Sequence, residues 1–254
     1  PISMNRRGVN PFAEAKLLLG YKKLLKKEAP DLVLTYSIKP NIYIGLLCRK
    51  TKIPYYANVQ GLGTAFQKPV LTSLVTVLYR IAFQNVQRVF FENEENAREF
   101  RERKILSADR QVVLSGAGIN LERYQMAPYP NHKRMHFLYL GRIMKEKGMD
   151  ELFYTVRRLK KENEDFILDL VGFFEEEYKD QVEELENSGI AHFYGFQSDP
   201  RMFYIEADCV VLPSYHEGMS NVLLEAAATG RPVITSNISG CRESVEAVSY
   251  THLR

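Results

Sequence analysis

Short apolar stretches of five to seven residues alternate along this chain with longer stretches in which apolar residues recur every three or four positions. The short stretches are rich in β-branched and aromatic residues, which predicts strands. The nine expected strands cover residues 31–36, 54–59, 88–93, 111–115, 136–141, 166–172, 192–196, 208–214 and 231–236. Helices are expected at about residues 10–27, 41–50, 70–84, 94–103, 149–161, 175–187 and 220–229.

Strands followed by helices in this rhythm predict βαβ units and parallel sheets. The apolar runs are continuous, as is typical of strands that are buried on both faces. The polar, proline-containing residues 128–134 are expected to link a first domain, residues 1–127, to a second domain, residues 135–246. The expected fold class is therefore α/β with two Rossmann-like domains.

The sign of the net charge changes close to the expected domain boundary. Residues 1–125 carry 20 Lys and Arg against 10 Asp and Glu, whereas residues 126–254 carry 14 against 21. Halves of opposite charge indicate two domains. The basic half includes a lysine-rich helix, and it leaves contact with an anionic membrane surface open. The basic residues of that helix are Lys16, Lys22, Lys23, Lys26 and Lys27.

Both ends of the sequence depart from the pattern of a complete pair of domains. The first expected element is a helix without a preceding strand, and each half has few strands for a doubly wound sheet. Residues 247–254 show no pattern that connects them to the fold, so we expect a non-native tail there. We therefore expect a fragment that is incomplete at both termini.

Composition limits the class of protein and its compartment. The chain is 45% hydrophobic and 26% charged, which is typical of a globular protein. No window is apolar over the length that a membrane span needs. The three cysteines, Cys48, Cys209 and Cys241, are isolated, so their spacing predicts neither a disulfide framework nor a zinc site. A reducing cytoplasm is the expected compartment.

The stretch EGMSNVLLEAAATG, residues 217–230, carries the strongest chemical signal. Glu217 is expected in the loop after a strand, and Glu225 about two turns into the following helix. The backbone N–H groups of Met219, Ser220 and Asn221 are expected to point outward at the helix N-terminus, which suits a phosphate or a sugar hydroxyl. An ordinary amphipathic helix would also explain this stretch taken alone.

A second signal, GRIMKEKG at residues 141–148, directly follows a strand. Arg142 and Lys147 lie on the strand-to-helix loop, where two cations can converge on a diphosphate and neutralise a leaving group. Gly141 allows the backbone to approach a ligand closely. Both signals follow strands of one parallel sheet, and ligands of open α/β sheets bind at the carboxyl ends of the strands. Together they predict a nucleotide-sugar site.

With these residues the chain resembles glycosyltransferase family 4, of the GT-B fold, in which two Rossmann-like domains have parallel sheets facing across a cleft. The family's E-x7-E motif matches Glu217 and Glu225, and its phosphate-binding Arg and Lys match Arg142 and Lys147. The first half resembles a branch that transfers N-acetylhexosamine-type sugars to polyprenyl-diphosphate-linked saccharides. That resemblance lies in TYSIKPNIYIGLLCR (35–49), NVQGLGTAF (58–66) and RVFFENEE (88–95).

The resemblance implies a retaining glycosyltransferase that takes a sugar from a nucleotide-sugar, with UDP as the expected nucleotide, for surface polysaccharide or glycan synthesis. Arg142, Lys147 and Glu217 are the expected catalytic residues, with the diphosphate on the two cations and the donor sugar at Glu217. Glu225 is expected to hold the ribose. The remaining expected donor-binding residues are Gly141, Gly172, Gly195, Phe196, Gly218, Met219, Ser220 and Asn221.

The resemblance implies no metal and no cofactor beyond the nucleotide-sugar substrate. The expected acceptor is a polyprenyl-diphosphate-linked saccharide, and the protein is expected in the cytoplasm or on the inner face of the plasma membrane. Nucleic-acid binding is not expected, because the basic half contains no recognition motif. The chain departs from the family at Gln60, which occupies the place of a His near the donor sugar.

Two alternatives stay open from the sequence. The first alternative is a nucleotide-sugar-binding fragment without turnover. The second is an enzyme of another class on the same fold, such as a nucleotide-sugar epimerase. A glycogen-type phosphorylase is disfavoured, because the chain contains no motif for a pyridoxal-phosphate lysine.

Overall fold

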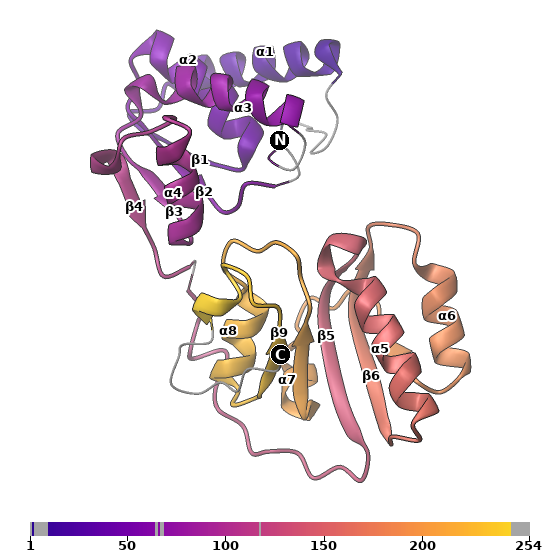
Figure 1. The fold of residues 1–254 in the computed structure, drawn as a ribbon. Coiled ribbons are helices and arrows are strands. Elements are labelled where there is room, and N and C mark those ends of the chain that lie inside the picture. Colours follow the sequence, from indigo (N-terminus) through magenta and orange to yellow (C-terminus); the bar gives the residue numbers. More distant parts are fainter. Residues whose placement is uncertain (1, 3–9, 64–65, 67–68, 117, 245–254) are drawn as a thin grey trace. The chain divides into compact units, whose positions relative to one another are not determined.

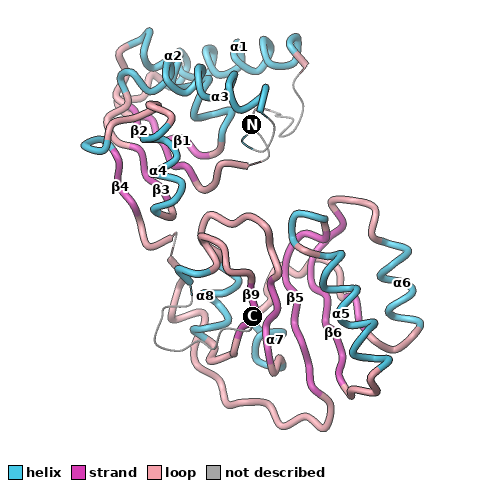
Figure 2. The backbone as a smooth tube through the Cα atoms, in the orientation of Figure 1, coloured by secondary structure: helices cyan, strands magenta, loops and turns pink. Residues whose placement is uncertain are grey.

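The computed structural model describes residues 2, 10–63, 66, 69–116 and 118–244 (Figure 1). The chain forms two compact units, Pro1–Ser115 and Gly116–Arg254. Strands and helices alternate through both units, as the hydrophobic pattern predicted (Figure 2). The expected tail, residues 247–254, lies outside the described residues.

The first unit contains one parallel sheet of four strands in the order β1-β2-β3-β4. The strands are β1 (Val33–Tyr36), β2 (Tyr55–Val59), β3 (Val89–Phe91) and β4 (Gln111–Val113). The helices are α1 (Pro11–Glu28), α2 (Ile38–Thr51), α3 (Pro69–Ala82) and α4 (Glu94–Glu102). Asn10 caps α1 as expected, because its side-chain oxygen accepts a hydrogen bond from the N–H of Phe12 at 3.0 Å.

The core of the first unit lies on one face of its sheet. Phe91 of β3 meets Phe100 of α4 edge to face at 5.0 Å, and Tyr79 of α3 meets the same ring at 5.1 Å. Burial alternates along β2, where every second residue is buried. On the opposite face Leu34 and Tyr36 are about half exposed. The expectation of strands buried on both faces is therefore wrong for this sheet, since the described helices cover one face.

The second unit contains a parallel sheet of five strands in the order β7-β6-β5-β8-β9. The strands are β5 (Met135–Ile143), β6 (Phe166–Phe174), β7 (Ala191–Phe193), β8 (Cys209–Leu212) and β9 (Val233–Thr235). The helices are α5 (Met149–Lys161), α6 (Lys179–Asn187), α7 (Arg201–Glu206) and α8 (Asn221–Ala228). Short 3-10 turns cover Lys145–Lys147 and Arg242–Ser244.

Helices cover both faces of the second sheet, as the continuous apolar runs predicted. Tyr139 and Leu170 pack with Phe153 of α5 on one face, whereas Leu138 and Val171 pack with Tyr204 of α7 on the other. The first seven residues of β6 are consequently all buried. Helix α7 is the element that the hydrophobic pattern did not predict.

The segment at residues 128–134, expected as a linker, is hydrogen-bonded to the body of the second unit. The hydroxyl of Tyr129 donates to the carbonyl of Asp208 at 2.6 Å, and Arg134 donates to the carbonyl of Gly189 at 2.8 Å. Residues 116–134 accordingly belong to the second compact unit. Among the described helices, none combines the length and the apolar character needed to cross a membrane.

Candidate functional site

The carboxyl ends of β5 and β6 approach each other closely at two expected donor-binding glycines. Gly141 and Gly172 are cross-strand partners. A Cβ atom at Gly172 would lie 1.8 Å from the carbonyl oxygen of Gly141, so no side chain fits there. The N–H of Gly172 also donates to the carbonyl of Gly195 at 2.9 Å. These three glycines therefore bring three strand ends close together, with Gly172 buried and Gly141 and Gly195 half-buried, at the end of the sheet where the sequence predicted the ligand.

The loop after β5 is pressed against the loop after β8. A Cβ atom at Gly148 would lie 2.1 Å from the carbonyl oxygen of Pro213, and Gly148 has a φ of 74° that favours glycine. The N–H of Tyr215 donates to the carbonyl of Glu146 at 3.0 Å. These contacts bring Lys147 and Glu217 together although they lie far apart in sequence.

Lys147 and Glu217 form a short ion pair in which both side chains are largely buried, at 15% and 14% exposed. The hydroxyl of Ser214 donates to the same carboxylate oxygen, Oε1, at 2.7 Å. In the protein without ligand, the charge of Lys147 is therefore balanced by Glu217. The carboxylate is fixed in place from two sides.

Arg142 lies beside this pair but is held less tightly. One guanidinium nitrogen is 3.8 Å from a carboxylate oxygen of Glu175, which is too long for a hydrogen bond, and the side chain is 42% exposed. The hydroxyl of Tyr139 donates to the carbonyl of Arg142 at 2.7 Å. Burial raises the pKa of Tyr139, and the nearby carboxylate of Glu217 raises it further. Tyr139 thus lies close to both Arg142 and Glu217.

Glu225 forms a separate cluster on α8. The hydroxyl of Tyr204 donates to its Oε2 at 2.7 Å, and Tyr124 lies close enough for this carboxylate to raise the pKa of its phenol. Glu225 is the fifth residue of α8, about one turn from its start instead of the expected two. The two tyrosines were not among the expected site residues.

The N-terminus of α8 differs from the expectation at Ser220. This residue is buried, its N–H donates to the carbonyl of Gly240 at 3.0 Å, and its Oγ accepts from the N–H of Leu223. The N–H of Ser220 therefore does not point outward to a ligand, because it is bonded to Gly240, while the side chain caps the helix. Gly218 and Met219 precede this cap in the loop after β8, and the first helical residue, Asn221, is exposed.

Two aromatic side chains extend from the ends of β6 and β7. Phe196 is 69% exposed and Phe173 is 44% exposed, and their rings meet edge to face at 6.4 Å. Sequence reasoning selected Phe196 and missed Phe173. An exposed aromatic pair at the carboxyl edge of the sheet offers a flat apolar surface for a nucleobase.

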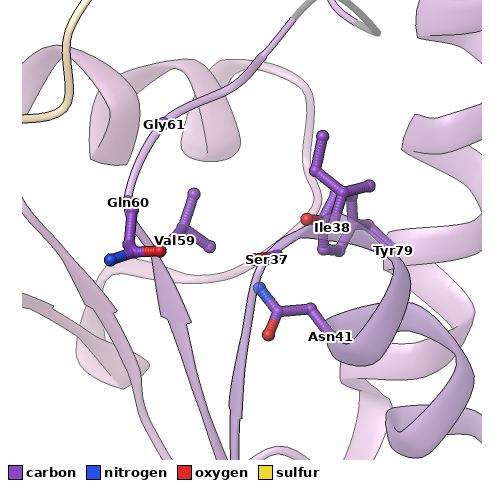
Figure 3. A pocket seen from close by; sticks show the side chains of 7 residues that line it. All are labelled: Ser37, Ile38, Asn41, Val59, Gln60, Gly61 and Tyr79. Atoms are coloured by element: carbon purple, nitrogen blue, oxygen red, sulfur yellow. The ribbon is translucent and has the colours of Figure 1, made fainter. Parts of the chain in front are cut away.

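The first unit has a pocket of about 170 Å³ at the carboxyl ends of β1 and β2 (Figure 3). Gln60 and Gly61 line it from the loop after β2, while Asn41 and Tyr79 approach from helices α2 and α3. Asn41 is fully buried and donates to the carbonyl of Asn58 at 2.9 Å. Gln60, which departs from the family pattern, therefore lies at a small pocket of the first unit that has both polar and apolar lining residues.

The charged groups of the site indicate which parts of a ligand it can bind. The second unit supplies Arg142, Lys147 and Glu217 after strands of its sheet, and the carboxylate of Glu225 on α8. Cations bind a diphosphate and carboxylates accept hydrogen bonds from sugar hydroxyls. In the described part of the chain, no group of three or more His, Cys, Asp or Glu side chains is placed to hold a metal ion.

Each unit of the chain matches a known protein family. Residues 123–249 match the family described as glycosyl transferases group 1, and residues 1–93 match the family described as glycosyl transferase 4-like. The chain is 30% identical, over 98% of its length and 69% of the relative, to a Campylobacter jejuni enzyme, N,N'-diacetylbacillosaminyl-diphospho-undecaprenol alpha-1,3-N-acetylgalactosaminyltransferase. It is 26% identical, over 94% of its length and 67% of the relative, to the capsular polysaccharide biosynthesis glycosyltransferase CapM of Staphylococcus aureus.

Solved structures show the same fold. The crystal structure of Anabaena HepE in complex with UDP and glucose matches 95% of this chain and 68% of its own, with a TM-score of 0.75 and 17% sequence identity. A sucrose-phosphate synthase of Thermosynechococcus elongatus matches 94% of this chain and 64% of its own, with the same TM-score and 19% identity. The expected α/β fold of the GT-B class is confirmed.

Proposed function

We propose that this chain, which belongs to the group 1 glycosyltransferases, moves a sugar from a UDP-sugar to a polyprenyl-diphosphate-linked saccharide and retains the anomeric configuration. Relatives that carry diphospho-undecaprenol in their names support the acceptor class, among them an Escherichia coli UDP-Gal:alpha-D-GlcNAc-diphosphoundecaprenol alpha-1,3-galactosyltransferase. The same Escherichia coli name, and the UDP bound to HepE, support the nucleotide.

The observation that carries the proposal is the cluster of Arg142, Lys147 and Glu217 at the carboxyl ends of β5 and β8. Glu217 is fixed by Lys147 and by Ser214, so one face of its carboxylate is oriented before a ligand arrives. Arg142 is exposed enough to turn toward an incoming diphosphate. Preorganised groups of this kind stabilise charge that develops during a reaction.

In the proposed mechanism the bond between the anomeric carbon and the diphosphate breaks first, and the sugar gains oxocarbenium character. Arg142 and Lys147 stabilise the charge that grows on the departing diphosphate. The departing phosphate oxygen takes the acceptor's proton, and the acceptor attacks from the same face of the sugar. Glu217 and Glu225 bind hydroxyls, so we do not assign them as the acid and nucleophile of a glycosidase.

The proposal includes no metal ion and no cofactor, because two protein cations supply the charge that a divalent ion would otherwise provide. Chelation is the direct check. We expect dialysis against EDTA to leave the affinity for UDP unchanged in metal-free buffer. A loss of affinity that Mg²⁺ or Mn²⁺ restores would overturn this part of the proposal.

Nucleotide binding is tested by calorimetry of the chain with UDP, GDP and ADP, alongside Glu225→Ala. We expect selective binding of UDP whose affinity falls about 10- to 100-fold in the Glu225→Ala variant. The ribose hydroxyls would have no charged acceptor in the variant, and hydrogen bonds to charged groups contribute about 1.5–3 kcal/mol. A folded chain that binds none of the three nucleotides would contradict a working donor site.

Turnover is tested with a UDP-sugar and a lipid-linked saccharide. We expect Arg142→Ala to lower kcat by about 100- to 1,000-fold, as removal of a preorganised electrostatic group typically does. Lys145→Ala is the matched control, since Lys145 is in the same loop, is 73% exposed and pairs with Asp150. Near-normal turnover by Arg142→Ala would contradict the assigned role.

The same assay separates the two alternatives. A nucleotide-sugar epimerase releases an isomerised donor without an acceptor, whereas a transferase needs the acceptor. A binding fragment without turnover binds UDP and transfers nothing. The family match favours the transferase, whereas the cations alone do not separate the two, because an epimerase that eliminates and re-adds the diphosphate also stabilises a departing diphosphate.

We also propose that the protein works in the cytoplasm, at an anionic membrane surface that α1 contacts. Its three cysteines are free and buried, as suits a reducing compartment. On α1 the apolar side chains Phe12 and Leu19 are 88% and 58% exposed. With a helical period they lie on the same face as Lys16 and Lys23. Apolar anchors among lysines are typical of helices that lie in the interface of an anionic bilayer.

Two leucines of α1, Leu17 and Leu25, are buried in the first unit, whereas Leu24 is 42% exposed. Flotation with vesicles of phosphatidylglycerol is the test. We expect the protein to float at low salt, and a Lys16→Gln/Lys23→Gln variant to float less. Equal flotation with neutral phosphatidylcholine vesicles, or none with either, would count against the membrane contact.

A further inference from the structure

The carboxylate of Glu225 is held by Tyr204, and a second tyrosine, Tyr124, packs against the ring of Tyr204 beside it. Tyr204 lies on α7, and Tyr124 lies in the segment before β5. Tyr204 donates to Oε2 at 2.7 Å and is fully buried. The rings of the two tyrosines meet edge to face, with centroids 5.9 Å apart. Glu225 thus lies beside two phenols.

The direction of hydrogen bonding at this carboxylate is fixed. Burial and the neighbouring Glu225 carboxylate raise the pKa of Tyr124 to about 12, and the same two causes raise the pKa of Tyr204 further. Both phenols therefore keep their protons at any physiological pH and can only donate to the carboxylate. A ligand that reaches the remaining lone pairs of Glu225 must also be a hydrogen-bond donor. A hydroxyl fits this requirement and a phosphate does not.

The tyrosines are in turn fixed by Arg231, which precedes β9 and is 3% exposed. Its Nε donates to the carbonyl of Tyr204 at 2.9 Å, and another nitrogen donates to the carbonyl of Pro128 at 2.6 Å. One buried guanidinium therefore ties α7 and the segment that follows Tyr124 to the sheet. Tyr204, which is fully buried, therefore has little freedom to move with a ligand, and Tyr124 packs against its ring.

From this geometry we propose that Tyr204 and Tyr124 are positioning residues, which orient Glu225 so that its unoccupied lone pairs face the ribose hydroxyls of the donor nucleotide. The proposal rests on the proposed function, in which Glu225 binds the ribose. It adds that the selection of a ribonucleotide over a 2′-deoxyribonucleotide depends on two side chains that do not touch the ligand. Without the phenols the carboxylate can rotate, and its preference for the diol weakens.

The test compares UDP and 2′-deoxy-UDP binding to the wild-type chain, to Tyr204→Phe and to Tyr124→Phe. Each substitution removes one hydroxyl and keeps the ring, so the packing is retained. We expect the wild-type chain to bind UDP at least 10-fold more tightly than 2′-deoxy-UDP. In Tyr204→Phe we expect the affinity for UDP to fall about 10-fold and the affinity for 2′-deoxy-UDP to change little, so that the discrimination is lost.

Tyr178→Phe is the matched control. Tyr178 also donates to a carboxylate, that of Asp150, at 2.8 Å, and burial raises its pKa too. It lies outside the proposed site, so we expect its removal to leave both affinities unchanged. A second check places Tyr204→Phe in the Glu225→Ala background. There we expect no further loss of UDP affinity, because the phenol acts through the carboxylate.

The outcomes separate the two proposals. If Tyr204→Phe weakens both nucleotides equally, or weakens neither, the positioning role is overturned while the donor site stands. A further loss in the Glu225→Ala background also overturns it. If the folded wild-type chain binds neither nucleotide, the proposed function itself fails. In the intact enzyme we expect the KM for the donor to rise in Tyr204→Phe with kcat nearly unchanged, as for a group that affects binding alone.

Discussion

The charges of Lys147 and Glu217 depend on each other, because both side chains are more than four-fifths buried and each is the other's counter-ion. A charge that loses its partner in such a place is costly, whereas removal of both charges is often nearly neutral. The pair therefore has two roles in this molecule. It orients the carboxylate of Glu217, and it gives the largely buried ammonium group of Lys147 a counter-ion.

We expect Lys147→Met to lower the free energy of unfolding by about 3 kcal/mol, since it leaves the Glu217 carboxylate with Ser214 alone. The double variant Lys147→Met/Glu217→Gln should recover at least about 1 kcal/mol of that loss. Urea unfolding of the two single variants and the double variant measures the coupling. Strictly additive effects would show that the two charges are independent.

The three cysteines give a second prediction about individual residues. Burial raises the pKa of the thiols of Cys48, Cys209 and Cys241 to about 11. At pH 8 about one thiol in a thousand is ionised in the folded protein, against about a quarter for an unperturbed cysteine. We expect almost no labelling by an aromatic disulfide reagent in the native state, and three labels per chain in guanidinium. Rapid native labelling of one thiol would contradict its burial.

At the residue scale, the sequence placed the carboxylates and cations but not their partners. The spacing of Glu217 and Glu225 follows from a local motif, and so does the position of Lys147 after its strand. The pairing of Lys147 with Glu217 depends on the close contact of Gly148 with Pro213, which no local pattern reveals. Tyr204 and Tyr124 were missed for the same reason, since their role exists only after the chain has folded.

At the scale of elements, the hydrophobic pattern predicted all nine described strands, with boundaries off by at most three residues. It missed α7, because six residues are too few to show a helical period. Asp199-Pro200 before Phe203 and Tyr204 was the available signal for a helix start. Helix α2 begins three residues earlier than expected and includes Pro40 in its first turn, where proline is tolerated.

The pairing of β5 with β6 gives a prediction at this scale. A methyl group at Gly172 would collide with the carbonyl of Gly141, so the two central strands must separate or bend. We expect Gly172→Ala to lower the free energy of unfolding by about 3 kcal/mol. Gly189→Ala is the control, because Gly189 has a φ of 67° and no neighbouring atom lies within 4 Å of the place that its methyl group would take.

The control variant should lose only the left-handed backbone preference, about 1 kcal/mol. Thermal unfolding followed by circular dichroism compares the two variants. Equal losses would mean that the close approach of the strands contributes nothing beyond backbone strain. A loss in Gly172→Ala that exceeds the loss in Gly189→Ala by about 2 kcal/mol would confirm that the two glycines are needed for the sheet edge.

At the scale of the whole molecule, every expected donor-binding residue lies in the second unit, between Gly141 and Glu225. The first unit contributes a separate pocket with Gln60 and the exposed lysines of α1. The sequence could predict two domains because net charges of opposite sign mark the two halves of the chain. It could not predict that residues 116–134 pack onto the second unit, since polar residues between domains resemble a linker in any sequence.

This division predicts where a nucleotide stabilises the chain. A ligand at 100 times its Kd stabilises the unit that binds it by about 2.7 kcal/mol, which corresponds to about a 100-fold lower population of the unfolded state. We expect UDP to slow hydrogen exchange about 100-fold at core amides of the second unit, such as those of β6, and to leave the amides of β2 and β3 unchanged. Exchange followed by mass spectrometry at peptide resolution distinguishes the units. If UDP slows exchange in both units by the same factor, they unfold together. If it slows exchange in the first unit alone, the donor site has been assigned to the wrong half of the chain.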